Sequence, residues 1–87
     1  MDNITDEAYL MTIIMGIVKK PDEIEIRRTK DDMGILLALR VAKSDMGLVI
    51  GRKGVIATAI RDLVHMFGLN HGEKTTLKIE EPDEQER

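Results

Sequence analysis

Hydrophobic and polar positions follow two different periods along this chain, and the switches between them predict where helices and strands lie. Over residues 6–19 apolar side chains recur every three or four positions, which is typical of a helix packed on one side. Thr5 can cap this helix with its hydroxyl, and Lys19 and Lys20 suit its C-terminal end before Pro21 stops it. The predicted buried face consists of Leu10, Ile13, Ile14, Ile17 and Val18.

A β-hairpin is predicted next, because the apolar period changes from helical spacing to alternation. Residues 24–27 alternate apolar and charged side chains, as in a strand with one buried face. Residues 30–34 contain Asp and Gly, which favour a turn. The nearly continuous apolar run over residues 35–41 predicts a second strand with both of its faces covered.

The second half of the chain predicts two helices and a last strand. Ser44 can cap a short helix through residue 50, and a longer helix is predicted over residues 55–67, with Gly68 ending it. The inward face of the longer helix is predicted to contain Ile56, Ile60, Leu63, Val64 and Phe67. Residues 75–79 alternate again and predict the final strand. The resulting order, α-β-β-α-α-β, places the chain in the α+β fold class.

Length and composition limit the functions that this chain can have. Its 87 residues and 9.8 kDa correspond to a single domain, predicted over residues 1–80, which leaves little room for a deep active site. Residues 81–87 are mostly acidic and are predicted to form a disordered tail. The absence of cysteine excludes thiol chemistry and disulfides. The acidic start and the short uncharged stretch over residues 8–18 predict a cytoplasmic protein with no membrane attachment.

Charge is distributed unevenly, although the formal net charge is only −3. Between residues 40 and 61, five basic residues accompany a single acid, Asp45, so this segment has a local charge of +4. The basic residues are Arg40, Lys43, Arg52, Lys53 and Arg61. Charge runs are usually solvated surface, so the place of this segment in the fold decides whether it can bind an anionic polymer.

The junction between the two predicted central helices, Gly51-Arg52-Lys53-Gly54, must reverse the chain in very few residues. Glycine adopts positive φ at little cost and lets a nucleic-acid backbone approach, while the next helix offers unpaired N–H groups and a positive dipole end. Arg52 and Lys53 add charge and hydrogen-bond donors for phosphate at the tip. Gly47, one helical turn earlier, leaves room for a strand passing alongside. Taken alone, a GxxG sequence is a weak signal, because many such loops are plain helix connections.

Residues 46–57, MGLVIGRKGVIA, resemble the KH signature of the small bacterial KhpA-type RNA-binding proteins, and the resemblance covers nearly the whole chain. It implies a type II KH domain, with helices packed on one face of a three-stranded sheet. It also implies that the GxxG loop clamps roughly four nucleotides of single-stranded RNA, while nearby aliphatic side chains hold the bases. The predicted RNA-binding residues are Gly47, Gly51, Arg52, Lys53, Gly54 and Val55.

The resemblance also implies a role and partners. Members of this family are RNA chaperones or post-transcriptional regulators without a cofactor or a catalysed reaction. They pair with themselves or with a larger KH-containing protein, so a homodimer or such a heteromer is expected. Two positions depart from the family pattern: Val55 stands where a basic residue is common, and Ala57 stands where broader KH signatures often have isoleucine. With only Tyr9 and Phe67 as aromatic residues, base stacking on aromatic rings is nearly excluded.

Other functional sites have weaker support in the sequence. His65 and His71 lack partners at metal-ligand spacing and are predicted to be surface histidines. The segment 47–54 has neither the GxGxxG spacing nor the Gly-Lys-Ser/Thr ending of the nucleotide-binding loops. Two alternatives to RNA binding remain. The first is a protein-interaction module that uses the apolar first helix as an interface, and the second is an enzyme acting on a small phosphorylated ligand.

Overall fold

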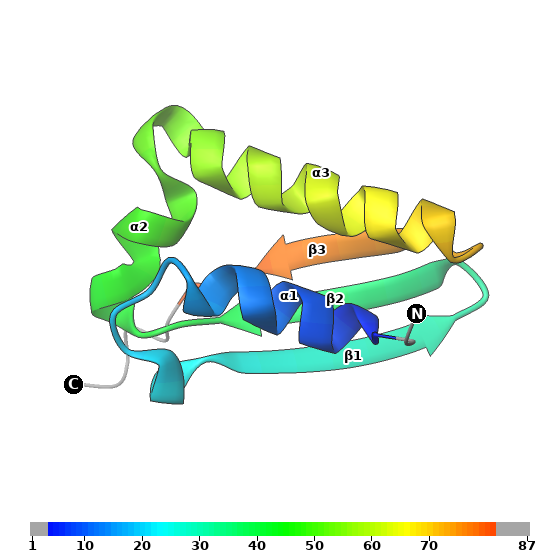
Figure 1. Ribbon diagram of the computed structural model, residues 1–87, viewed down its shortest axis with the longest axis horizontal. Helices are drawn as coiled ribbons and strands as arrows, with labels where there is room; N and C mark the ends of the chain where they lie inside the picture. Colours follow the sequence, from blue (N-terminus) through cyan, green and yellow to red (C-terminus); the bar gives the residue numbers. More distant parts are fainter. Residues whose placement is uncertain (1–3, 82–87) are drawn as a thin grey trace.

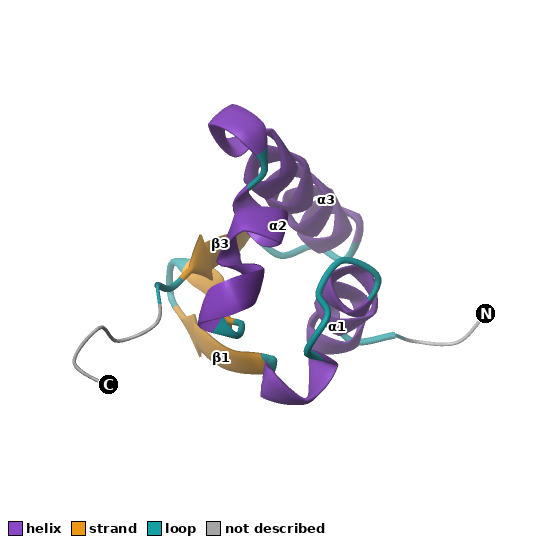
Figure 2. Cartoon of the chain, turned by 90° about the vertical axis from the view of Figure 1, so that its left-hand side faces the viewer, coloured by secondary structure: helices purple, strands orange, loops and turns teal. Residues whose placement is uncertain are grey.

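The computed structural model describes residues 4–81 and shows a three-stranded sheet with its helices on one face (Figures 1 and 2). The helices and strands are α1 (Asp6–Met15), β1 (Glu25–Asp31), β2 (Gly34–Arg40), α2 (Met46–Ile50), α3 (Val55–Asn70) and β3 (Thr75–Ile79). Short 3-10 turns lie in the connections: η1 (Pro21–Glu23), η2 (Lys43–Asp45) and η3 (Arg52–Gly54). The α+β class and the α-β-β-α-α-β order are confirmed. Of the predicted acidic tail, all but Glu81 lies outside the described residues.

The central strand of the sheet is β2, which pairs antiparallel with β1 and parallel with β3. The hairpin is tighter than predicted, because β1 continues to Asp31, which pairs with Gly34. The Met33 N–H donates to the Asp31 carboxylate at 2.8 Å, and Gly34 has φ 128°, which suits this short turn. The parallel pairing of β2 with β3 requires a long crossover. That crossover contains α2, α3 and the loop between them.

The core lies between the sheet and the helices and consists of aliphatic side chains. Its fully buried members include Leu10, Ile14, Leu37, Leu39, Val49 and Val64. On the opposite face of β2, the Leu36 residue is 38% exposed to solvent. The prediction of a strand covered on both faces is therefore wrong. The reason is that the helices cover one face only, and exposed side chains of β1, such as Thr29 opposite Leu36, line the other.

Helix α1 begins as predicted but ends earlier. The Thr5 Oγ1 accepts a hydrogen bond from the Ala8 N–H at 3.0 Å, which confirms the N-terminal cap. The helix stops at Met15 instead of continuing to residue 19, and Gly16 is its C-cap. The predicted role of the two lysines at the helix end is therefore wrong.

A buried carboxylate explains the path of the chain after α1. Asp45 is 2% exposed, and its two oxygens accept hydrogen bonds from the backbone N–H groups of Lys19 and Lys20 at 3.2 and 3.0 Å. A carboxylate buried away from water needs hydrogen-bond donors such as these. Lys19 and Lys20 can supply their backbone N–H groups because both residues lie outside α1, whereas N–H groups inside a helix already donate to helix carbonyl oxygens. These bonds tie the α1–β1 connection to the start of α2. Ser44, the predicted cap of α2, makes no capping hydrogen bond and instead lies in η2.

The long helix α3 packs over the sheet through Ala57, Ile60, Val64 and Gly68. Gly68 was predicted to end this helix, but the helix continues to Asn70. A Cβ at position 68 would lie 2.3 Å from the Thr75 Oγ1, so the glycine serves the close approach of α3 and β3. Ile56 and Leu63, predicted to be buried, are 36% and 42% exposed at the margin of the packed face.

Candidate nucleic-acid interface

The α2–α3 junction forms a tight loop in which three of four residues have positive φ. Gly51 has φ 76°, Lys53 has φ 57° and Gly54 has φ 77°. Among the residues that the structure describes, Lys53 is the one non-glycine residue with positive φ. Hydrogen bonds from the Gly51 N–H to the Gly47 carbonyl (2.9 Å) and from the Gly54 N–H to the Gly51 carbonyl (3.2 Å) close the loop. The left-handed lysine costs about 1–2 kcal/mol, and strain of this kind is typical of ligand-binding sites.

The glycines of this region have different physical roles. A Cβ on Gly51 would lie 2.2 Å from the Ile56 Cγ1 and 2.9 Å from the Ile56 backbone nitrogen, so any side chain there would displace the start of α3. Gly54 has open space around it, but its positive φ favours glycine. Gly47 has neither constraint, because a Cβ there would meet no atom within 4 Å. The surface beside α2 is therefore open at Gly47, as a passing nucleic-acid strand requires.

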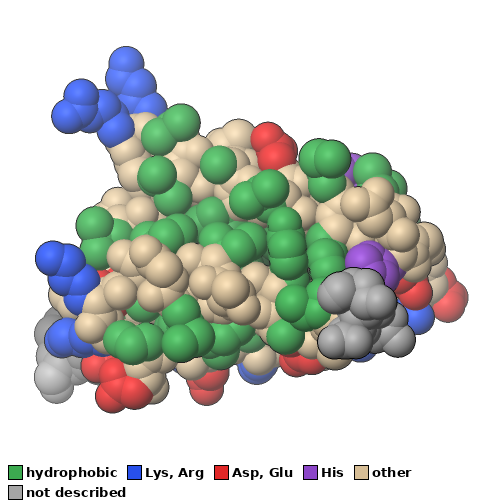
Figure 3. Space-filling view, viewed as in Figure 1, with side chains coloured by type: hydrophobic (Ala, Val, Ile, Leu, Met, Phe, Trp, Pro, Cys, Tyr) green, Lys and Arg blue, Asp and Glu red, His purple; other side chains and the backbone are tan. Residues whose placement is uncertain are grey.

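Arg52 and Lys53 are exposed at the tip of the loop. Figure 3 shows basic side chains projecting from the corner of the molecule where Figure 1 draws the α2–α3 junction. Within residues 4–81, neither Arg52 nor Lys53 forms an ion pair, whereas four other basic residues do. The pairs are Arg27 with Glu80, Arg28 with Asp6, Lys30 with Glu73 and Arg40 with Glu25. The positive charge of the loop therefore remains available to an external anion.

The first turn of α3 adds backbone donors to this charge. The N-cap of α3 is Gly54, which has no side chain. The first N–H groups of α3 therefore receive no capping hydrogen bond from the N-cap residue. The free N–H groups and the positive end of this 16-residue helix favour a bound phosphate. Val55 is 60% exposed and offers apolar surface next to the loop, whereas Ala57 is buried behind it.

The aromatic side chains lie away from the loop. The Tyr9 ring stacks on Phe67 with centroids 4.7 Å apart, and Phe67 stacks on His71 at 4.2 Å. Phe67 is twelve residues beyond Val55 on the same helix, which corresponds to about 18 Å along the axis. A base bound at the loop would therefore contact aliphatic side chains, as the composition predicts.

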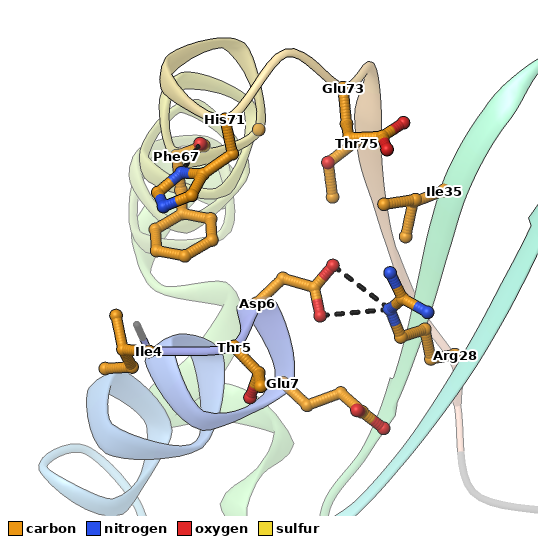
Figure 4. Close-up of a pocket in the computed structure, with 11 residues that line it drawn as sticks. Ile4, Thr5, Asp6, Glu7, Arg28, Ile35, Phe67, His71, Glu73 and Thr75 are labelled. Carbon is orange, nitrogen blue, oxygen red and sulfur yellow. Dashed lines mark hydrogen bonds and ion pairs between the residues drawn. The ribbon is translucent and has the colours of Figure 1, made fainter. Parts of the chain in front are cut away.

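A cavity of about 420 Å³ lies at the other end of the molecule, where the N-terminus of α1 and the C-terminus of α3 meet the sheet (Figure 4). On its wall, the Arg28 Nε donates to both oxygens of the Asp6 carboxylate at 3.1 Å. The Thr75 Oγ1 is buried beside it and has no hydrogen-bond partner among residues 4–81, and the His71 Nδ1 lies 2.8 Å from the Phe67 carbonyl oxygen. None of the hydrogen bonds among the described residues joins this histidine to a hydroxyl. The cavity therefore shows no nucleophile paired with a base.

Within residues 4–81, no group of three or more His, Asp or Glu side chains is placed to hold a metal ion. His65 and His71 are both exposed, as predicted for surface histidines. Over the same range, no helix has the length and apolar character needed to cross a membrane.

The structure brings the predicted RNA-binding residues together at one corner of the molecule. Gly47 lies one turn of α2 before the loop, and Val55 begins α3 directly after it. The sequence did not predict that Lys19 and Lys20 would contact the residue preceding α2. The signal that could have indicated this is Gly16, because a glycine inside an apolar helical pattern also fits a helix end.

Comparisons with known proteins identify the relatives of this chain. The model of the family described as KhpA/KhpB, KH domain, matches residues 7–79. The RNA-binding protein KhpA of Listeria monocytogenes is 37% identical over 73 residues, covering 84% of this chain and 96% of that protein. The proteins of the same name from Bacillus subtilis and Clostridium acetobutylicum are 38% and 36% identical over 73 residues, again 84% of this chain and 90% and 97% of theirs. The matched range includes all three strands and the GxxG loop, and the chain belongs to the KhpA/KhpB KH-domain family.

Proposed function

We propose that this protein binds single-stranded RNA through the loop Gly51–Gly54 and the adjoining residues Gly47 and Val55, without catalysing a reaction. The observation that carries the proposal is the loop itself, with two exposed cations at a strained turn before an uncapped helix end. The relatives are named as RNA-binding proteins, which supports the same ligand. With such binding, the protein would act in the cytoplasm as an RNA chaperone or a post-transcriptional regulator.

The chemistry of the loop favours the backbone of one strand. Arg52 and Lys53 can donate to phosphate oxygens, and the N–H groups of the first turn of α3 point toward the helix N-terminus, where the loop lies. The exposed Val55 and the bare backbone at Gly47 leave space for sugars and bases beside the loop. Bases that are neither stacked nor paired can turn toward the aliphatic side chains beside the loop. The bases of a duplex are held inside the helix and cannot, so a duplex fits this surface poorly.

A titration with matched nucleic acids tests this proposal. Fluorescence anisotropy should show micromolar binding to a short single-stranded RNA and much weaker binding to the same sequence as a duplex, because few cations and no aromatic platform contribute. Different single-stranded sequences should bind with similar affinity. Tighter binding to the duplex than to the single strand would contradict the proposal. If no RNA bound while the protein still assembled with a protein partner, the alternative of an interaction module would be favoured.

We also propose that the protein self-associates through the outer margin of α3. The sequence pointed to α1 as the interface, but most apolar side chains of α1 face the core, and Met15 is its one large hydrophobic residue with high exposure. Along α3, by contrast, Ile56, Leu63 and Met66 are 36%, 42% and 58% exposed on one side of the packed face. Figure 3 shows hydrophobic side chains following α3 across this view of the molecule. Apolar surface of this kind is typical of a protein interface.

The substitution Leu63→Glu is expected to abolish this self-association. Leu63 lies in the middle of the apolar strip, and a carboxylate there would have to lose its water in the interface. The monomer should remain folded, because Leu63 is already 42% exposed. Sedimentation velocity at high micromolar concentration should show a dimer for the wild type and a monomer for the variant, with His65→Glu on the opposite margin as control. A wild type that stays monomeric would contradict this part of the proposal.

A further inference from the structure

Three lysines from two distant parts of the sequence meet at one end of α2. The Asp45 carboxylate accepts hydrogen bonds from the backbone of Lys19 and Lys20, so these residues lie against the turn that contains Lys43. All three lysines are exposed, and none of them forms an ion pair within the described part of the chain. We refer to Lys19, Lys20 and Lys43 as the lysine cluster.

The lysine cluster and the GxxG loop lie at the two ends of α2. This helix has five residues, which corresponds to a length of about 8 Å. Figure 2 shows the loop, α2 and the α1–β1 connection together on the end of the molecule that faces the viewer. In Figure 3, basic side chains lie along the same end, at the upper corner and below it. Between the two positive regions, Gly47 leaves the surface of α2 without a side chain.

We infer that the lysine cluster is a second phosphate-binding region, on which an RNA strand continues after it leaves the GxxG loop along α2. The inference rests on the proposed RNA binding and adds the path that the RNA strand takes over the protein surface. Single-stranded RNA is the ligand that fits, because it carries phosphates at regular spacing and can contact both regions at once. A KH loop holds only about four nucleotides, so a longer strand is needed to reach the cluster.

Acidic groups near the cluster limit the path. The Asp45 carboxylate lies behind the lysines, is buried, and is already hydrogen bonded to their backbone. Asp22 and Glu23, exposed in η1, follow the two lysines along the chain and would repel a phosphate. The strand is therefore expected to cross α2 and end at the lysine cluster without crossing η1.

Backbone amide shifts in a nitrogen-15-labelled protein can test the path directly. A tetranucleotide should shift the amides of the loop and of the adjoining Gly47 and Val55 but not those of the lysine cluster, whereas a strand about three times as long should also shift the lysine amides. Unchanged lysine amides with the longer strand, despite shifts in the loop, would overturn the inference and leave the proposed function intact. Failure of both RNAs to shift the loop would overturn both.

A variant that removes two positive charges from the lysine cluster tests the contribution of the cluster to the binding free energy. Lys19→Gln combined with Lys20→Gln should fold normally, because the bonds to Asp45 use backbone N–H groups. The variant should bind the tetranucleotide like the wild type and the longer strand several-fold more weakly, with the slope of log K against log salt reduced by about 1.4. Lys74→Gln with Lys78→Gln, which removes the same charge from β3 and the residue before it, is the matched control and should change both affinities little. Equal losses in the two double variants would overturn the inference, because the effect would then be one of net charge.

Discussion

Replacing both Arg52 and Lys53 by aspartate is expected to abolish RNA binding, with a loss of at least about tenfold in affinity. The change replaces two donors to phosphate by two anions at the positive end of α3, so it turns attraction into repulsion. The wild-type protein should show a log-log salt slope of roughly −1.4 to −2.1, as expected for two or three neutralised phosphates of a single strand. The variant should lose most of this slope.

The same variant should keep the stability of the wild type. Both side chains are exposed, and substitutions at such positions usually change the free energy of unfolding by less than about 0.5 kcal/mol. Aspartate also tolerates the left-handed conformation that Lys53 adopts, and a carboxylate close to a helix N-terminus is favourable. Thermal unfolding followed by circular dichroism checks this expectation.

A control separates the loop from the effect of net charge. Lys74→Asp with Lys78→Asp makes the same change in charge at two exposed positions away from the loop, and it should weaken RNA binding only modestly. If the folded Arg52 and Lys53 variant bound RNA as well as the wild type, the loop assignment would be wrong. The alternative of an interaction module would then be favoured, since such a module would not need the loop charge.

The loop could be predicted from the sequence because its chemistry is local. Two glycines three residues apart, two cations between them and apolar helical patterns on both sides occupy one short segment. Its conformation depends mainly on those residues, and the structure places positive φ at both glycines as a tight turn requires. The positive φ of Lys53 could not be predicted, because it depends on how the loop closes between α2 and α3 and a lysine alone does not favour it.

The parts of the fold that the sequence did not predict depend on contacts between distant residues. The apolar period of α1 continues past Met15, so periodicity alone extends the helix, whereas the buried Asp45 carboxylate takes the N–H groups of Lys19 and Lys20. Gly68 resembles a helix stop, and only the neighbouring Thr75 on β3 explains why the helix continues through it. Each case concerns a polar group or a close approach that local patterns do not encode.

The contact between Gly68 and Thr75 leads to the largest expected change in stability. In Gly68→Ala the new Cβ would lie 2.3 Å from the Thr75 Oγ1 and 2.8 Å from the Glu73 carbonyl oxygen. Because one of these neighbours is backbone, β3 must move relative to α3, and overpacking of this kind costs about 1–3 kcal/mol or more. A clash with backbone places the cost at the upper end of this range, about 3 kcal/mol, and alanine is the better helix former by about 1 kcal/mol, so a net loss of about 2 kcal/mol is expected. For a domain of this size, the melting temperature should fall by about 8–16 °C.

Gly47→Ala provides the matched control for this prediction. Gly47 also lies within a helix, but a Cβ there would meet no atom within 4 Å, so the same substitution should stabilise the protein by up to about 1 kcal/mol. Adding Thr75→Ala to the Gly68→Ala variant removes the nearest clashing atom, the Oγ1, and should restore part of the lost stability. A double-mutant cycle measured by urea unfolding gives this coupling directly. If Gly68→Ala were as stable as Gly47→Ala, the close packing of α3 on β3 would not be what requires a glycine at position 68.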